Sequence, residues 1–361
     1  MQQEAATDTS ALAESLRGLV RAGAGQGRAP DEPVVLADRA DGTVVRLGSA
    51  VAKAHAADAD AAGLELRLRI AADPGLAGIL LPPLPPGTVS RLADGRPATL
   101  WPYGTPVDPE APDAAPWEEA GTLLARLHAV RPDGLRRRLG CGPLPAMRGP
   151  AKAARALDRM RTALAAPLAD ATTGAHAAPA HAAATVIERV WAGLPAWCRA
   201  DEGAVPPRTD ALCHGDFHLG QLVRHPAPGG PWQLIDVDDL GAGDPVWDLA
   251  RPAAWYAAGL LPPAAWQRLL HAYEHASAAS GGASRDAWPY GDPWRQLDAP
   301  ARALTAQTAA VAVAKSVTER RPLDEDEEAL VSACERIAAM PNYGQAGRRS
   351  VDPPANRTPR R

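Results

Sequence analysis

Residues 212–248 read LCHGDFHLGQLVRHPAPGGPWQLIDVDDLGAGDPVWD, and they decide how the rest of the chain is interpreted. Two strand-like segments, residues 221–224 and 232–237, flank a turn rich in Pro and Gly, a pattern that predicts a β-hairpin. Asp216 precedes the first segment, and Asp236 lies near the end of the second. We therefore expect the hairpin to bring the two carboxylates toward one another.

The polar residues of this stretch have the spacing that phosphoryl transfer from ATP requires. That reaction needs a carboxylate that orients and deprotonates the accepting hydroxyl, and oxygen ligands that hold magnesium on the phosphates. Kinase catalytic loops supply an Asp and, five positions later, an amide ligand for the metal. Asp216 and Gln221 have this spacing. Asp236 leaves the end of an apolar segment, where a magnesium ligand is expected to reach the active site.

The stretch resembles the aminoglycoside phosphotransferase/choline kinase superfamily, whose motif runs His-Gly-Asp then Asn, followed by Ile-Asp and by Gly-Asp-Pro and Asp-Leu-Ala. The matching positions are His214-Gly215-Asp216, Ile235-Asp236, Gly243-Asp244-Pro245 and Asp248-Leu249-Ala250. The resemblance implies that Asp216 is the catalytic base and Asp236 the principal magnesium ligand. Gln221 replaces the usual Asn but presents the same carbonyl oxygen to the metal. The HLGQ form of residues 218–221 is also similar to maltokinase-type actinobacterial sugar kinases.

The first 105 residues predict a small β-rich lobe. Short apolar segments bounded by turn residues, including Asp41-Gly42 and Asp94-Gly95, indicate strands and hairpins. The expected elements are a leading helix at residues 10–21, strands at 33–38, 43–47, 50–54, 88–92 and 97–102, and a helix at 58–70.

The resemblance also implies nucleotide-binding roles within this lobe. Lys53 lies in the third strand, where such folds place a lysine that contacts the ATP phosphates and pairs with a glutamate on the following helix. Glu65 is the only glutamate between Lys53 and the end of the lobe. Residues 99–103 (TLWPY) take the position of the hinge between the lobes, so Trp101 and Tyr103 are expected to receive adenine through backbone groups.

Beyond Pro116 the pattern becomes helical. Helices are predicted at residues 117–130, 150–165, 182–197, 262–280, 300–318 and 324–340, interrupted only by the hairpin. The predicted fold is therefore α+β, bilobal and protein-kinase-like. A nucleotide-binding lobe spans residues 1–105 (with a leading helix and loop at 1–30), a helical catalytic and substrate lobe spans 106–343, and a disordered tail spans 344–361. ATP is expected between the lobes.

Composition and charge narrow the range of partners. A net charge of −4 gives no electrostatic reason to expect nucleic acid. The four cysteines form no CxxC pair, which suggests a reducing compartment. The start of the chain lacks the basic head and apolar body of a signal peptide, and no apolar run is long enough to cross a bilayer. We expect a cytoplasmic monomer or homodimer that acts on a small hydroxylated molecule and does not bind membranes.

Several polar residues near the motif have both a structural and a functional interpretation. Asp238 and Asp239 would either add to the metal or substrate site or cap a turn, and the turn is favoured. Asp244 and Asp248 suit helix entry, where a carboxylate accepts free backbone N–H groups. His214 is expected to brace the loop and not to perform chemistry.

Two other kinds of enzyme site are compatible with parts of the stretch. LIDVDDL, residues 234–240, has the form of a haloacid dehalogenase nucleophile motif, in which Asp236 would attack phosphate. That fold needs repeated strand–helix units afterwards, whereas residues 249–340 are almost all helical in pattern. A metal site is the other possibility, although neighbours on a strand point to opposite faces. Its candidate ligands are Cys213, His214, Asp216 and His218.

The remaining alternative is a pseudokinase that binds nucleotide or a partner without catalysis. Gln221 departs from the usual Asn, and the loop between the first two strands offers only Asp41-Gly42 in place of a glycine-rich phosphate cradle. Magnesium-dependent turnover of ATP with a hydroxyl substrate separates the enzyme from this alternative.

Overall fold

In the computed structural model, the chain forms two compact units. The first comprises Met1–Gly149, Pro206–Pro252 and Pro262–Arg295, and the second comprises Pro150–Val205, Ala253–Leu261 and Gln296–Arg361. The structure describes residues 17–18, 32–39, 42–85, 87–166, 174–279, 288 and 291–340. The predicted leading helix, apart from residues 17 and 18, and the predicted tail lie outside the described residues.

An antiparallel sheet of five strands forms in the N-terminal part of the first unit, which confirms the predicted β-rich region. Its strand order is β1-β2-β3-β5-β4. The strands are β1 (Val34–Arg39), β2 (Gly42–Leu47), β3 (Ala50–His55), β4 (Ser90–Arg91) and β5 (Pro97–Pro102). β4 is shorter than the strand predicted at residues 88–92, because the carbonyl of Leu92 already accepts a turn hydrogen bond from Gly95 at 2.9 Å.

The two faces of this sheet have different roles. One face packs into a core of small and apolar side chains: Val45, Leu47, Ala50, Ala52, Ala54, Leu92 and Ala98. Because successive side chains of a strand point to opposite faces, Lys53 and His55 of β3 lie on the same face, away from this core. The alternation therefore places the side chains of Lys53 and His55 next to each other on this face.

Helix α2 (Ala61–Ala71) follows β3 and buries only one of its sides. It begins at Asp60, whose carboxylate accepts a hydrogen bond from the Gly63 amide at 3.0 Å and so caps the first turn. The buried positions of the helix are Leu64, Arg67, Leu68, Ile70 and Ala71. This spacing leaves Glu65 on the exposed side.

The predicted hairpin is formed by β8 (Leu222–Arg224) and β9 (Trp232–Leu234), and β6 (Thr105–Pro106) pairs with β8. β9 ends earlier than predicted, because the chain turns at Asp236, which has a positive φ of 62°. A second small sheet, β7 (Ala211–Cys213) with β10 (Gly241–Gly243), is not predicted, because three-residue strands are too short to show alternation.

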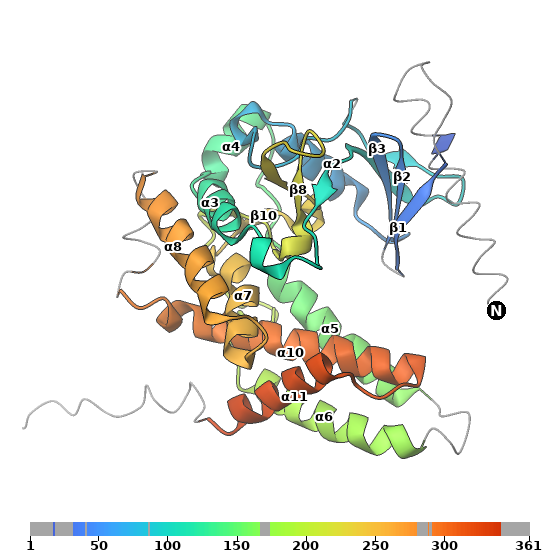
Figure 1. Cartoon of the computed structure of the whole chain (residues 1–361), viewed down its shortest axis with the longest axis vertical. Coiled ribbons are helices and arrows are strands. Elements are labelled where there is room, and N and C mark those ends of the chain that lie inside the picture. Colours follow the sequence, from blue (N-terminus) through green and yellow to red (C-terminus); the bar gives the residue numbers. More distant parts are fainter. Residues whose placement is uncertain are drawn as a thin grey trace, which may run out of the picture. The chain divides into compact units, whose positions relative to one another are not determined.

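Besides α2, the first unit contains α3 (Trp117–His128), α4 (Pro132–Leu139), the start of α7 (Val246–Ala258) and α8 (Pro263–Ala279). Helices α3 and α8 pack closely against one another (Figure 1). Gly121 permits this approach, because a Cβ added there would lie 2.3 Å from the carbonyl oxygen of Leu269. Single 3-10 turns occur at Pro74–Leu76, Pro112–Ala114, Leu219–Gln221 and Val237–Asp239.

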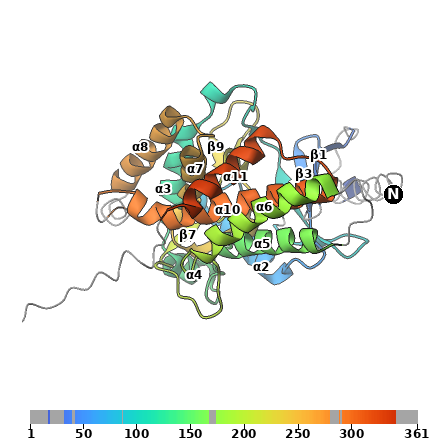
Figure 2. The ribbon, with the colours of Figure 1, turned by 90° about the horizontal axis from the view of Figure 1, so that it is seen from below.

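The second unit is helical. Its helices α5 (Gly149–Ala165), α6 (Gly174–Ala192), α10 (Trp294–Glu319) and α11 (Glu325–Ala338) lie alongside one another (Figure 2). Asp324 and Glu327 form a capping box at the start of α11, so the acidic segment there stabilises a helix N-terminus. Among the described residues, none of the helices has the length and hydropathy needed to span a bilayer.

The close contact of α3 with α8 makes a stability prediction. Gly121→Ala should lower the free energy of unfolding by about 1–3 kcal/mol, because the new methyl group must displace the backbone of α8. Gly142→Ala is the matched control, since nothing lies within 4 Å of the Cβ that it adds. Urea denaturation of both variants measures the difference. Equal stability of the two would contradict the close packing.

Candidate active site

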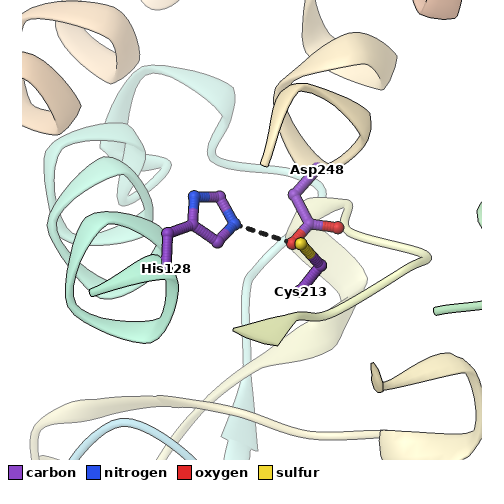
Figure 3. A group of neighbouring side chains, drawn as sticks. All are labelled: His128, Cys213 and Asp248. Carbon is purple, nitrogen blue, oxygen red and sulfur yellow. Dashed lines mark hydrogen bonds and ion pairs between the residues drawn. The ribbon is translucent and has the colours of Figure 1, made fainter. Parts of the chain in front are cut away.

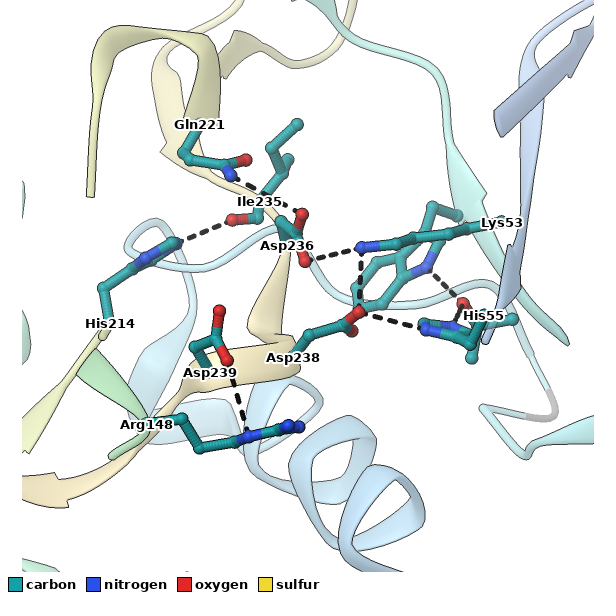
Figure 4. Close-up of polar contacts among 11 residues, drawn as sticks. Lys53, His55, Arg148, His214, Gln221, Ile235, Asp236, Asp238 and Asp239 are labelled. Carbon is teal, nitrogen blue, oxygen red and sulfur yellow. Dashed lines mark hydrogen bonds and ion pairs between the residues drawn. The ribbon is translucent and has the colours of Figure 1, made fainter. Parts of the chain in front are cut away.

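Lys53 lies at the centre of a cluster of charged side chains in the first unit (Figure 4). Its Nζ is 2.7 Å from Oδ1 of Asp236 and 2.9 Å from Oδ2 of Asp238. Burial acts to lower the pKa of Lys53, but the two carboxylates outweigh burial and raise it. Lys53 therefore stays charged, and it links β3 to the turn that follows β9.

The pair of side chains predicted to bind magnesium is brought together by the hairpin. Nε2 of Gln221 donates to Oδ2 of Asp236 at 3.5 Å, and the Ile235 amide donates to the Gln221 carbonyl at 2.9 Å. Asp236 adopts a left-handed backbone conformation that is uncommon for a residue other than Gly, and such conformations are often found at functional sites. The side-chain amide of Gln221 and the carboxylate of Asp236 are thus neighbours, and carboxylate and amide oxygens are donor types that magnesium prefers.

Asp216 lies in the loop between β7 and β8 and contacts an arginine that sequence reasoning did not single out. Nη2 of Arg251, on α7, donates to Oδ1 of Asp216 at 2.7 Å, and each side chain is 14% exposed. The Nε of Arg251 is buried and has no hydrogen-bond partner. The sequence does not indicate that Arg251, just after the Asp-Leu-Ala motif, contacts Asp216, because a lone arginine on a helix is usually a surface residue.

The loop that carries Asp216 is held by Asp248, which is buried (Figure 3). Oδ1 of Asp248 accepts from the Gly215 amide at 2.7 Å, and Oδ2 accepts from the His214 amide at 2.7 Å. Oδ2 also accepts from Nε2 of His128 at 2.9 Å. Burial acts to raise the pKa of Asp248, but these hydrogen-bond donors outweigh it and lower the pKa. Asp248 thus fixes the backbone next to Asp216 instead of capping a helix.

His214 ties the same loop to the hairpin. Its Nε2 donates to the carbonyl of Ile235 at 2.8 Å, one residue before Asp236. Gly215, with a φ of 84°, approaches the backbone of Asp239 so closely that a Cβ would lie 2.3 Å from that carbonyl oxygen. The loop and the hairpin are therefore joined by backbone contacts, and His214 braces them as expected.

The metal-site alternative based on CHGDFH is not supported by the geometry. The ring of His214 faces Ile235, and Nδ1 of His218 accepts from the Gly220 amide at 3.1 Å. Among the described residues, the group with metal-ligand proximity is instead His128, Cys213 and Asp248. Both oxygens of Asp248 already accept hydrogen bonds there, and burial raises the pKa of Cys213, so this group acts as a brace.

The expected pair of Lys53 with Glu65 is not formed. Glu65 is exposed on α2, and Lys53 contacts Asp236 and Asp238 instead. The inward position of α2 is occupied by Arg67, whose Nε donates to the carbonyl of Leu240 at 2.9 Å. Although Val237–Asp239 does form the favoured turn, Asp238 also belongs to the charged cluster.

The two predicted hinge residues have different environments. Trp101 is buried, and its Nε1 donates to Oγ1 of Thr99 at 2.9 Å. The Tyr103 amide donates to the carbonyl of Ser49 at 2.7 Å, and the Tyr103 carbonyl accepts from Nδ1 of His225 at 3.1 Å. The Tyr103 amide is thus already used within the protein, and an adenine nitrogen would have to compete with the Ser49 carbonyl for it, whereas the Tyr103 carbonyl can accept a second hydrogen bond.

Comparison with known families identifies the chain. Residues 76–294 match the family model described as the phosphotransferase enzyme family, and this range is more than half of the 361 residues. The chain belongs to this family. Within this phosphotransferase, the match covers the loop of Asp216, the hairpin and Asp248. A search of curated proteins finds no match.

Solved structures share the fold of this phosphotransferase. A choline/ethanolamine kinase family protein from Mesorhizobium loti is 16% identical, with a TM-score of 0.51 over 94% of this chain and 96% of that chain. A spectinomycin phosphotransferase in complex with ADP and spectinomycin is 12% identical, with a TM-score of 0.51 over 86% and 90%. A thermostable mutant of an aminoglycoside phosphotransferase, in a ternary complex with AMP-PNP and hygromycin B, is 15% identical, with a TM-score of 0.50 over 90% and 97%. The predicted kinase-like fold is confirmed.

The bracing role of Asp248 is testable through stability. Asp248→Asn should lower the free energy of unfolding by about 3–5 kcal/mol. The new side chain is uncharged and has one acceptor oxygen in place of two, so buried N–H donors that now bind the carboxylate would lose their acceptor. Asp133→Asn is the control, since Asp133 is 82% exposed in its ion pair with Arg136 and should change stability by less than about 1 kcal/mol. Denaturant titration measures both variants. If Asp248→Asn lost no more free energy of unfolding than the control, Asp248 would not stabilise the loop as described.

Proposed function

We propose that this phosphotransferase is a kinase that uses ATP and magnesium to phosphorylate a hydroxyl group of a small molecule. The acceptor would be a sugar, an amino sugar or an aminoglycoside-like compound. The observation that carries the proposal is the convergence of Lys53, Asp236 and Gln221 next to the braced loop of Asp216. ATP use is supported by the nucleotides named for two neighbours of the same fold, ADP and AMP-PNP. Because the reaction consumes ATP, a cytoplasmic location is part of the proposal.

Asp216 is the proposed catalytic base. Its carboxylate would accept the proton of the acceptor hydroxyl as that oxygen attacks the γ-phosphate, while the bond from the γ-phosphorus to the bridging oxygen breaks and ADP leaves. Arg251 donates to Oδ1 of Asp216 at 2.7 Å, which restricts the orientation of the carboxylate. A fixed guanidinium next to the base orients it and adds positive charge where the transferred phosphate carries negative charge. Arg251 is therefore a proposed positioning residue.

Lys53 would hold the ATP phosphates, and Asp236 with Gln221 would hold magnesium. The amide of Gln221 can turn its carbonyl oxygen toward the metal, because the Asn or Gln amide assignment depends on the hydrogen-bond partner. Bound magnesium would offset the charge of the phosphates as it does in other kinases. The protein's own contribution is to keep these groups in place before the substrates arrive, which reduces the reorganisation that the reaction requires.

The second candidate function is a pseudokinase that binds nucleotide without catalysis. Two observations favour it: Gln221 replaces the usual Asn, and the loop between β1 and β2 offers only Asp41-Gly42 in place of a glycine-rich phosphate cradle. The contacts that hold the loop of Asp216 support catalysis over this alternative. Asp248 and His214 fix the backbone of this loop, and a catalytic base needs such a fixed position, whereas nucleotide binding alone does not.

Turnover decides between the two. The full-length protein should consume ATP in the presence of magnesium with at least one acceptor from a panel of hexoses, amino sugars, maltose and aminoglycosides. Asp216→Asn should lower kcat about 10²–10⁴-fold with little change in nucleotide affinity, because it removes the base but not the phosphate contacts. Asp133→Asn, distant in sequence and exposed, is the matched control.

An assay of phosphate transfer to each acceptor measures this effect. Failure of the whole panel, with intact nucleotide binding, would favour the pseudokinase. Full activity of Asp216→Asn would refute the proposed base.

A further inference from the structure

We propose that Asp238, oriented by His55, replaces the helix glutamate as the carboxylate that anchors Lys53 for nucleotide binding. The inference rests on the proposed function, because it assumes that Lys53 contacts ATP phosphates. It goes further by assigning two positioning residues that the family motif does not contain. Oδ2 of Asp238 lies 2.9 Å from Nζ of Lys53 and 3.0 Å from Nδ1 of His55 (Figure 4).

A lysine in this position needs an anchor that stays in place when nucleotide binds. Its long side chain has many rotamers, and ordering it at binding costs affinity. Asp236 also contacts Lys53, but Asp236 is the proposed magnesium ligand, and a carboxylate on a metal is a weaker partner for an ammonium group. Asp238 is the remaining carboxylate in contact with Lys53 among the described residues.

Helix α2 cannot supply the anchor in this conformation. Glu65, the glutamate expected to do so, is exposed on the outer side of the helix. Arg67 takes the buried position and is 5% exposed, with its Nε bound to the carbonyl of Leu240. The buried residues of α2 thus include a positive charge but no carboxylate, and the carboxylates in contact with Lys53 come from the turn that follows β9.

Asp238 is itself held by a chain of hydrogen bonds that starts in β5. Nε1 of Trp101 can only donate, so Oγ1 of Thr99 accepts from it at 2.9 Å. Oγ1 of Thr99 lies 3.0 Å from Nε2 of His55, and Nδ1 of His55 lies 3.0 Å from the Asp238 carboxylate, which accepts. The first three side chains are buried, with exposures of 9% for Trp101, 1% for Thr99 and 4% for His55.

This chain gives each residue a defined orientation. The carboxylate at one end can only accept, so the Nδ1 hydrogen of His55 points toward Asp238, and Nε2 on the opposite side of the ring is held by Thr99. Thr99 is opposite Lys53 in the β3–β5 ladder, so the chain and the lysine share one patch of the sheet. His55 therefore acts through Asp238, and its contribution should disappear when Asp238 is removed.

The test measures binding of a fluorescent ADP analogue by the full-length protein, with and without magnesium. Asp238→Asn, which keeps the size of the side chain, should weaken binding about tenfold or more in both conditions, because the charge that orients Lys53 is lost. His55→Ala should weaken binding less, and should have no further effect in an Asp238→Ala background. Asp238→Glu should retain part of the affinity. Glu65→Ala is the matched control and should bind as the wild type does.

Three outcomes would overturn the inference. An unchanged affinity of Asp238→Asn together with a lower affinity of Glu65→Ala would restore the helix glutamate as the anchor. A loss confined to the magnesium condition would make Asp238 a metal ligand. If the effects of His55→Ala and Asp238→Ala on affinity were additive, His55 would not act through Asp238. Circular dichroism of each variant controls for folding. If the wild-type protein bound no nucleotide, the proposed function would fail, and the inference with it.

Discussion

Lys53 forms ion pairs with Asp236 and Asp238, which lie in a distant part of the chain. Lys53 and Asp236 are 183 residues apart in the sequence. Lys53 is 18% exposed and each carboxylate 31% exposed, and the cost of partly removing these charges from water is offset when they meet in good geometry. The ion pairs therefore favour an arrangement in which the sheet that carries Lys53 lies close to the turn that carries Asp236 and Asp238. The same contacts bring a positive charge next to carboxylate oxygens, at the place where we propose that phosphates and metal bind.

A second constraint keeps the reacting groups in register. Asp248 fixes the backbone of His214 and Gly215, and His214 reaches across to the carbonyl beside Asp236. The proposed base and the proposed metal ligand are thus positioned through a few short hydrogen bonds and not through long flexible segments. Such preorganisation is what electrostatic catalysis requires, because groups that are already oriented need not move during the reaction.

Much of the first-unit architecture and the core of the site could be predicted from local sequence patterns. The hairpin followed from two strand-like segments around a turn, and the pairing of Gln221 with Asp236 followed from that hairpin. The partners of Lys53 and Asp216 could not be predicted, because they depend on which side of α2 is buried and on where α7 lies. Arg251 and Asp238 acquire their roles only through these tertiary contacts.

The central claim is that the chain holds nucleotide through Lys53 and magnesium through Asp236. Calorimetric titration of AMP-PNP onto the full-length protein, with magnesium and then with EDTA, tests it most directly. We expect magnesium to tighten binding about tenfold or more in the wild-type protein, and to have little effect in Asp236→Asn. An affinity that is the same with and without magnesium, or the same response in Asp236→Asn, would contradict the account.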